Sequence, residues 1–275
     1  MSIVLPSQCA NKANSSTSLR ASIVGINGVG KSTVLRKVVD KLSNDYMVLK
    51  TGPNLPVYAT HNHQNEYSFK WILTAIGFLR ALSKRLGLTS LTQKLSNYKS
   101  TFIHMVVEPK LAKKFNPEVI LGERDFIIDC ASSPEIFSEA HKDLDIEDRL
   151  ASLLREMKGH NLPNIIFFLT APPSVAAERI QGRFQVTGKE IRRHDNASSL
   201  LLMHLKYYQT ITAISNAYKA RIFILDSSKI SPDEIVDQIT GIIKLYVEHG
   251  PPCEVDEPHY MDRNPDRMQM LDEFQ

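Results

Sequence analysis

The sequence has few of the residues that mark secreted, metal-binding or membrane-spanning proteins. Its three cysteines, Cys9, Cys130 and Cys253, are scattered and lack the spacing of metal ligands. We therefore expect reduced thiols, with neither a disulfide framework nor a zinc site. No apolar run is long enough to cross a membrane, because Pro172 and Pro173 interrupt the best candidate. The first residues lack a basic region followed by an apolar stretch, so we expect a cytoplasmic protein.

Neither sign of charge is in strong excess. The net charge of +3 is too small to indicate a nucleic-acid partner. The length suits one large α/β domain. Residues 7–18 are rich in Ser and Asn, and residues 250–275 are rich in Asp, Pro and Met. These compositions predict flexible tails over residues 1–18 and 250–275, on either side of a domain that spans residues 19–249.

A phosphate-binding motif is the most specific feature that the sequence contains. Residues 25–32 read Gly-Ile-Asn-Gly-Val-Gly-Lys-Ser and match the pattern G-x-x-x-x-G-K-[ST]. Residues 19–24 suit a buried strand, and residues 33–39 carry apolar side chains at helical spacing. A phosphate cradle needs inward-facing glycine N–H groups, a helix N-terminus and a lysine, and all three are present in order. We expect ATP to bind here, since a chance glycine-rich turn would not fill four fixed positions between strand and helix.

The side chains of this loop have distinct expected roles. Lys31 neutralises the outer phosphates, and the hydroxyl of Ser32 holds Mg²⁺. The expected nucleotide-binding residues are Gly25, Asn27, Gly28, Val29, Gly30, Lys31, Ser32 and Thr33.

Strand-like and helix-like segments alternate through the domain, which is typical of a parallel sheet covered on both faces. We predict a three-layer α/β/α fold with a five-stranded parallel sheet and the phosphate loop after its first strand. The predicted strands are residues 19–24, 46–51, 118–122, 164–170 and 221–225. The predicted helices are residues 31–43, 67–86, 94–114, 146–157, 173–183, 198–218 and 232–248, the last of them capped by Ser231.

An acid and an arginine follow the third predicted strand. Glu123 and Arg124 come directly after the apolar residues 119–121, at the carboxyl edge of the sheet, where ligands bind in open α/β folds. Glu123 is a candidate base for an acceptor hydroxyl, or a residue that orients Mg²⁺ through water. Arg124 is a candidate clamp for an anionic acceptor. The alternative is a surface turn whose charges only solvate the strand end.

A basic segment follows the fourth predicted strand and its helix. Residues 179–193 carry five basic side chains, with glycines at positions 182 and 188. Phosphoryl transfer spreads charge over three oxygens, so cations placed around them assist it. We predict a mobile lid over about residues 182–197, with Arg179 and Arg183 as its catalytic cations. The alternative is an exposed basic loop.

These motifs together resemble the thymidylate kinase family of P-loop nucleoside monophosphate kinases over most of residues 21–245. Residues 25–33 resemble the family's phosphate loop, Glu123-Arg124 its Asp-Arg pair, and residues 179–193 its lid. The resemblance implies transfer of the γ-phosphoryl group of ATP, with Mg²⁺, to a nucleoside monophosphate such as dTMP. It implies a small-molecule acceptor as the partner, without nucleic acid or membrane, and leaves a homodimer open.

Departures from the family pattern fall on the acceptor side. Asn27 stands where the family's loop usually has an acid, and residues 51–54 read Thr-Gly-Pro-Asn instead of Arg-Glu-Pro-Gly. The Glu123-Arg124 pair also resembles that of deoxynucleoside kinases. The acceptor is therefore open between a nucleoside monophosphate, a nucleoside, a sugar and another small phosphate compound. A binding protein that has lost acceptor chemistry also remains open, whereas a GTPase lacks its guanine-reading Asn-Lys-x-Asp segment.

Several other residues have a plainer expected role. We expect His61 and His63 to lie in a surface loop, because no further ligand completes a metal site. Phe78 and Leu79 are expected on the packed face of a helix together with Trp71, although an acceptor base could stack there. Two aspartates also have an expected role. Asp129 is either a second carboxylate near the acceptor or a helix cap, and Asp226 is expected to be structural.

Overall fold

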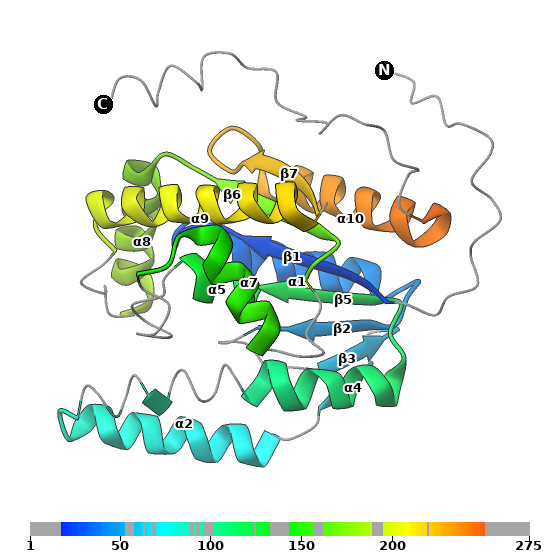
Figure 1. Cartoon of the computed structure of the whole chain (residues 1–275), viewed down its shortest axis with the longest axis horizontal. Helices are drawn as coiled ribbons and strands as arrows, with labels where there is room; N and C mark the ends of the chain where they lie inside the picture. The colour runs from blue at the N-terminus through cyan, green and yellow to red at the C-terminus, as the bar shows by residue number, and fades with distance from the viewer. Residues whose placement is uncertain are drawn as a thin grey trace.

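The computed structural model describes residues 18–52, 58–62, 64–67, 70–88, 91, 94–95, 102–123, 125–132, 143–156, 162–188, 195–218 and 220–250. Over these residues the chain forms one mixed sheet with helices on both faces (Figure 1). The α/β prediction is therefore confirmed. No helix of the described residues is both long and apolar enough to cross a membrane.

The sheet has seven strands in the described part of the chain, in the order β4-β3-β2-β5-β1-β6-β7. All five predicted strands are present and run parallel to one another. The other two, β3 and β4, form an antiparallel hairpin on the edge beside β2. The strand bounds are β1 Leu19–Val24, β2 Val48–Thr51, β3 Tyr58–His61, β4 Gln64–Tyr67, β5 Val119–Glu123, β6 Ile165–Thr170 and β7 Arg221–Asp226.

The prediction of a five-stranded, fully parallel sheet is wrong at this edge. The hairpin residues are mostly polar, so their sequence reads as a loop. In the structure His61 pairs with Gln64 across a two-residue turn, and Asn62 adopts a left-handed φ of 48°. Asparagine tolerates this conformation, which tight hairpin turns require. The expected surface loop at His61 is thus the end of a strand, and His63 lies outside the described residues.

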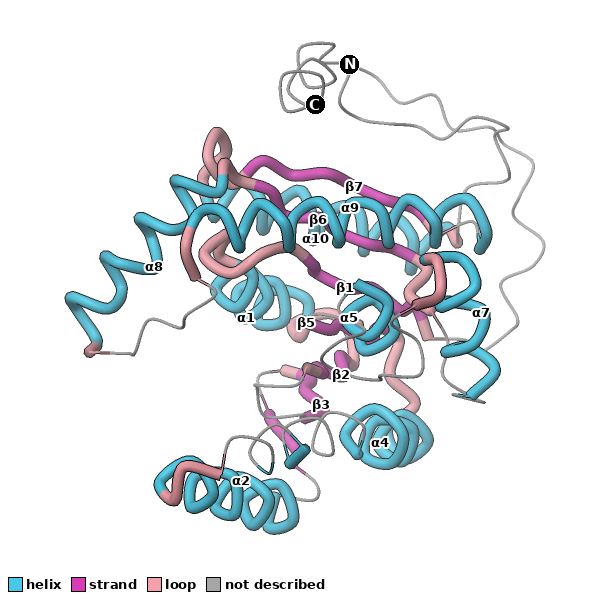
Figure 2. Tube along the Cα trace, turned by 60° about the vertical axis from the view of Figure 1, so that its left-hand side comes forward, coloured by secondary structure: helices cyan, strands magenta, loops and turns pink. Residues whose placement is uncertain are grey.

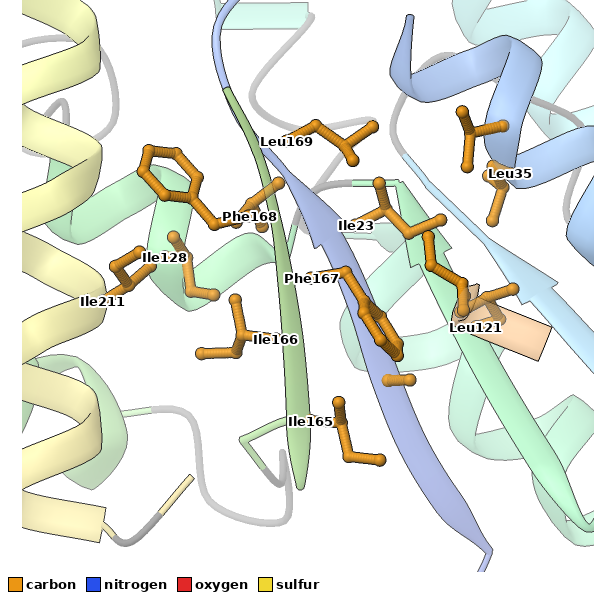
Figure 3. Close-up of a cluster of buried hydrophobic side chains, with 14 of the residues drawn as sticks. Ile23, Leu35, Leu121, Ile128, Ile165, Ile166, Phe167, Phe168, Leu169 and Ile211 are labelled. Atoms are coloured by element: carbon orange, nitrogen blue, oxygen red, sulfur yellow. The ribbon is translucent and has the colours of Figure 1, made fainter. Parts of the chain in front are cut away.

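The central strands are buried on both faces. All six residues of β6 are buried, which is why this segment is continuously apolar instead of alternating. Successive side chains point to opposite faces. Phe168 lies on the side of Ile128 and Ile211, whereas Leu35 packs on the other side with Ile23 and Leu121 (Figure 3).

Helices α1 (Lys31–Leu42) and α10 (Pro232–His249) cover one face of the sheet, and α5 (Phe126–Ser132), α7 (Ile146–Glu156) and α9 (Ala197–Tyr218) cover the other (Figure 1). A five-residue π-helix, η1 (Ile103–Val107), leads into α4 (Glu108–Phe115), which packs on β2 and β3. Helix α8 (Pro173–Thr187) packs on α9, and Figure 2 shows its outer half projecting beyond the other helices.

The observed helix α2 differs in two ways from the helix predicted over residues 67–86. Helix α2 (Lys70–Arg85) begins later than expected, because Tyr67 ends β4. Phe78 and Leu79 were expected on its packed face, yet their side chains are 67% and 51% exposed. Helix α2 lies apart from the layers that cover the centre of the sheet, which accounts for this exposure (Figure 2). Trp71's side chain lies outside the described residues.

Candidate functional site

The phosphate-motif loop connects β1 to α1 at the carboxyl edge of the sheet. Three of its glycines have positive φ angles: 139° at Gly25, 89° at Gly28 and 92° at Gly30. A Cβ atom on Gly25 would lie 2.2 Å from the carbonyl oxygen of Leu169, and one on Gly28 would lie 2.4 Å from that of Ala176. Both contacts are with backbone, so the loop passes too close to β6 and α8 for any other residue type.

Helix α1 starts at Lys31 with its N-terminus turned toward this loop. Gly30 is its N-cap in the left-handed conformation, no side chain of the described residues caps it, and its first turn contains no acid. The N–H groups of Thr33 and Val34 both donate to the carbonyl oxygen of Gly30. An N-terminus of this kind favours a bound anion through its unpaired donors and its dipole.

Lys31 lies along the loop instead of extending into solvent. Its side chain is 5% exposed, and its Nζ donates a hydrogen bond of 2.6 Å to the carbonyl oxygen of Ile26. The ammonium group is therefore fixed beside the glycine-rich turn, where it can neutralise phosphate oxygens.

Ser32 and Glu123 meet across the edge of the sheet. The hydroxyl of Ser32 donates to Glu123 Oε1 over 2.8 Å. The pairing of β1 with β5 brings Glu123 beside Ile23, one residue from the end of β1. These two oxygen groups are the predicted magnesium ligands, and hydroxyl and carboxylate oxygens suit that ion. No group of three or more His, Cys, Asp or Glu side chains in the described residues could hold a metal ion.

Asn27 contacts a side chain that lies far from it in the sequence. Its Nδ2 donates to Asp195 Oδ1 over 2.9 Å, across 168 residues of the chain. Asp195 is only 7% exposed and lies two residues before α9. No local pattern marks Asp195, because an acid just before a helix reads as part of its cap.

The two described arginines of the prediction, Arg179 and Arg183, both lie on α8. Arg179 donates through both terminal nitrogens to Ser227, over 3.1 Å to its Oγ and 2.7 Å to its carbonyl oxygen. It thereby joins α8 to the turn after β7. Arg183 lies one turn further along α8, where every residue from 181 to 187 is exposed. Arg124 lies outside the described residues, as do residues 189–194 of the predicted lid, so both roles stay predictions.

The ends of β2 and β5 lie side by side on the predicted acceptor side. Gly52 has a φ of 150°, and a Cβ atom there would lie 3.2 Å from the carbonyl oxygen of Glu123. The side chain of Lys50 is 5% exposed, with Nζ 4.8 Å from the ring centroid of Tyr58 and 3.4 Å from its hydroxyl. Burial lowers the pKa of Lys50, although the charges of Asp40 and Glu123 oppose the shift. This buried lysine was not among the site residues predicted from the sequence.

The remaining acids of the edge have protein partners. Asp125, which was not singled out from the sequence, caps α5 by accepting from the N–H of Ile127 at 2.9 Å. Asp129 is therefore not the helix cap; it accepts from the hydroxyl of Tyr207 over 2.6 Å, and both side chains are buried. Asp226 accepts from the N–H and hydroxyl of Ser228, which agrees with its expected structural role.

The chain has structural similarity to solved proteins. No protein-family model and no curated protein matches the sequence. A solved structure of deoxyadenosine kinase from M.mycoides, described with products dcmp and a flexible dcdp bound, is similar with a TM-score of 0.47 and 15% sequence identity. The match covers 82% of this chain and 99% of that chain.

Proposed function

We propose that this protein transfers the γ-phosphoryl group of ATP to a small acceptor, with Mg²⁺ as cofactor. The observation that carries the proposal is the combination of a complete phosphate loop with the Ser32–Glu123 contact at its rim. The loop supplies backbone donors and the ammonium of Lys31 for the phosphates, and the hydroxyl–carboxylate pair supplies oxygen ligands. Mg²⁺, when bound, neutralises charge on the phosphate oxygens.

The protein's own part in the reaction is to hold the triphosphate and place the acceptor in line with it. The acceptor oxygen bonds to the γ-phosphorus as the bond from that phosphorus to the β–γ bridging oxygen breaks, which releases ADP. Lys31 and the loop N–H groups stabilise the charge on the transferring and leaving oxygens. If the acceptor is a hydroxyl, its proton passes to the carboxylate of Glu123.

We propose a nucleoside monophosphate such as dTMP as the first acceptor class and a deoxynucleoside as the second. A phosphate acceptor arrives with its attacking oxygen deprotonated, so Glu123 would serve only to orient Mg²⁺. A nucleoside acceptor requires a base, and the carboxylate of Glu123, which accepts from Ser32, is the group proposed for that role. Arg124 is proposed to bind an anionic acceptor, and Arg183 to provide a lid cation.

The experiment is an acceptor screen with ADP formation as the readout. Purified protein, ATP and Mg²⁺ are incubated with nucleoside monophosphates, deoxynucleosides and sugars, one at a time, with Lys31→Ala as the blank. We expect ADP release that depends on one acceptor class and is absent from the blank. Turnover that requires a macromolecule would indicate a switch or motor. ATP binding without any turnover would indicate a binding protein.

A further inference from the structure

The contact between Asn27 and Asp195 has no role in the function proposed above. Asn27 lies in the middle of the phosphate loop, and its amide nitrogen donates to a carboxylate that is only 7% exposed. An ionised carboxylate accepts hydrogen bonds and cannot donate them, so residue 27 must present a donor here. An asparagine meets this requirement, and an aspartate in its ionised form does not.

Helix capping does not explain Asp195. The capping side chain of α9 is its neighbour Asn196, whose Oδ1 accepts from the N–H of Ser199 over 2.9 Å. A buried carboxylate is costly unless hydrogen bonds and favourable charge surround it. The bond from Asn27 and the nearby N-terminus of α9 supply part of this compensation.

The loop is thus held from two directions. Gly28 lies against the backbone of Ala176 in α8, and the next residue back, Asn27, is bonded to Asp195 ahead of α9. Since α8 and α9 pack on each other, the two contacts join the loop to one helical unit. A shift of Asp195 would therefore move the backbone donors that surround the phosphates.

We propose that Asp195 is a positioning residue for phosphate binding and transfer, and that it acts through Asn27. In this part of the site the carboxylate belongs to Asp195. Residue 27 is a neutral amide, which can donate a hydrogen bond to that carboxylate. The proposal rests on the proposed function, because it assumes that the loop binds a nucleotide triphosphate. On this proposal Asn27 is the hydrogen-bond partner of Asp195, and an asparagine at this position does not indicate that acceptor chemistry has been lost.

The test is a double-mutant cycle on two isosteric substitutions. Asn27→Asp puts two carboxylates at hydrogen-bond distance, and we expect it to weaken ATP binding and kcat/KM by roughly tenfold to 100-fold, the range of coupled neighbouring charges. Asp195→Asn leaves two amides, and a loss of less than about tenfold is expected. The exchange Asn27→Asp/Asp195→Asn restores one acid and one amide, and should recover ATP binding to within about threefold of the wild type.

The Kd for ATP is measured by calorimetry without an acceptor, alongside kcat and KM for any acceptor found. Asp145→Ala is the control; it removes the carboxylate that caps α7 by accepting from the N–H of Asp148, so it should lower Tm and leave the Kd unchanged. If the wild type does not bind ATP, the proposed function fails. If it binds ATP but the effects of the two substitutions add, the positioning proposal is wrong. If Asn27→Asp does not fold, rescue of folding by the exchange supports the proposal, and failure of both overturns it.

Discussion

The two edges of the sheet carry buried charge in different ways. At the amino edge, Arg20 of β1 contacts Glu108 of α4, whose other oxygen is 3.2 Å from Nδ1 of His104. The side chains of Glu108 and His104 are 1% and 2% exposed. At the carboxyl edge, Ser32 is exposed and Glu123 is only partly buried. The closed cluster stabilises the fold, whereas the open pair can exchange its hydrogen bond for a ligand.

The two ends of one strand are therefore expected to differ, one in its contribution to stability and the other in its contribution to the proposed function. Strand β1 begins beside the ion cluster and ends in the phosphate loop. A charged group that is fully enclosed must be paired, and its loss leaves partners buried without compensation. A charged group at an open edge can be replaced with little cost to folding. Substitutions at the two edges should therefore have opposite effects on stability and activity.

The largest expected effect is at the amino edge. Arg20→Met removes one partner of a buried ion pair and leaves the buried Glu108 without its guanidinium, so the free energy of unfolding should fall by about 3–5 kcal/mol. Urea unfolding followed by circular dichroism measures it. The specific activity of the folded fraction should stay near the wild-type value. A fully stable Arg20→Met protein would show that the cluster does not hold the fold.

Loss of Lys31 should have the next largest effect, on activity alone. Lys31→Ala removes the fixed ammonium beside the loop, and transfer should slow by about 10² to 10³. The lost hydrogen bond to the carbonyl oxygen of Ile26 should lower Tm by only a few degrees. Single-turnover rates measure the loss of transfer, and a thermal melt of the same sample measures the change in Tm. Near-normal turnover in the folded variant would contradict the role of the loop.

The amino-edge cluster of Arg20, His104 and Glu108 should make the free energy of unfolding depend on pH in the acid range. Burial alone would raise the pKa of Glu108, but the hydrogen bond from His104 and the charge of Arg20 outweigh it and lower the pKa from 4.5 to about 2. A depressed carboxyl pKa gives stability that is present above about pH 4.5 and is lost as pH falls toward 2. The loss should amount to roughly 3 kcal/mol. In Glu108→Gln this part of the pH dependence should disappear.

The smallest expected effect is at Lys50, which lies under α1 near the carboxyl edge. Burial disfavours its charged form, so Lys50→Met should raise the free energy of unfolding at neutral pH by about 1 kcal/mol. Because its pKa is lowered, the wild type should gain stability as pH rises toward 10.5, and the variant should not. A higher acceptor KM in Lys50→Met would place this lysine in the acceptor site.

Patterns local in sequence predicted much of the molecule. The phosphate loop, the five parallel strands and the Ser231 cap each depend on residues within a few positions, and the cap is present as a reciprocal pair with Glu234. The antiparallel hairpin was not predicted, because its polar residues pair only with each other and with β2. Helix α5 was not among the predicted helices, because its seven residues are too few to show a helical period.

Contacts between distant residues could not be predicted. Asp195 meets Asn27 across 168 residues, and Glu108 meets Arg20 across 88. Such pairs depend on how helices pack over the sheet, which no spacing in the sequence encodes. The phosphate loop was therefore predictable from its motif, whereas the contact of Asn27 with Asp195 was visible only in the folded structure.

The most direct measurement is a side-by-side comparison of Glu123→Gln and Glu108→Gln. Both replace a carboxylate by an amide of the same shape, one at each edge of the sheet. We predict that Glu123→Gln lowers kcat for phosphoryl transfer at least about tenfold with an unchanged free energy of unfolding. Glu108→Gln should lower the free energy of unfolding and leave kcat of the folded protein unchanged. Loss of stability in Glu123→Gln together with normal transfer would contradict the assignment of the carboxyl edge as a phosphoryl-transfer site.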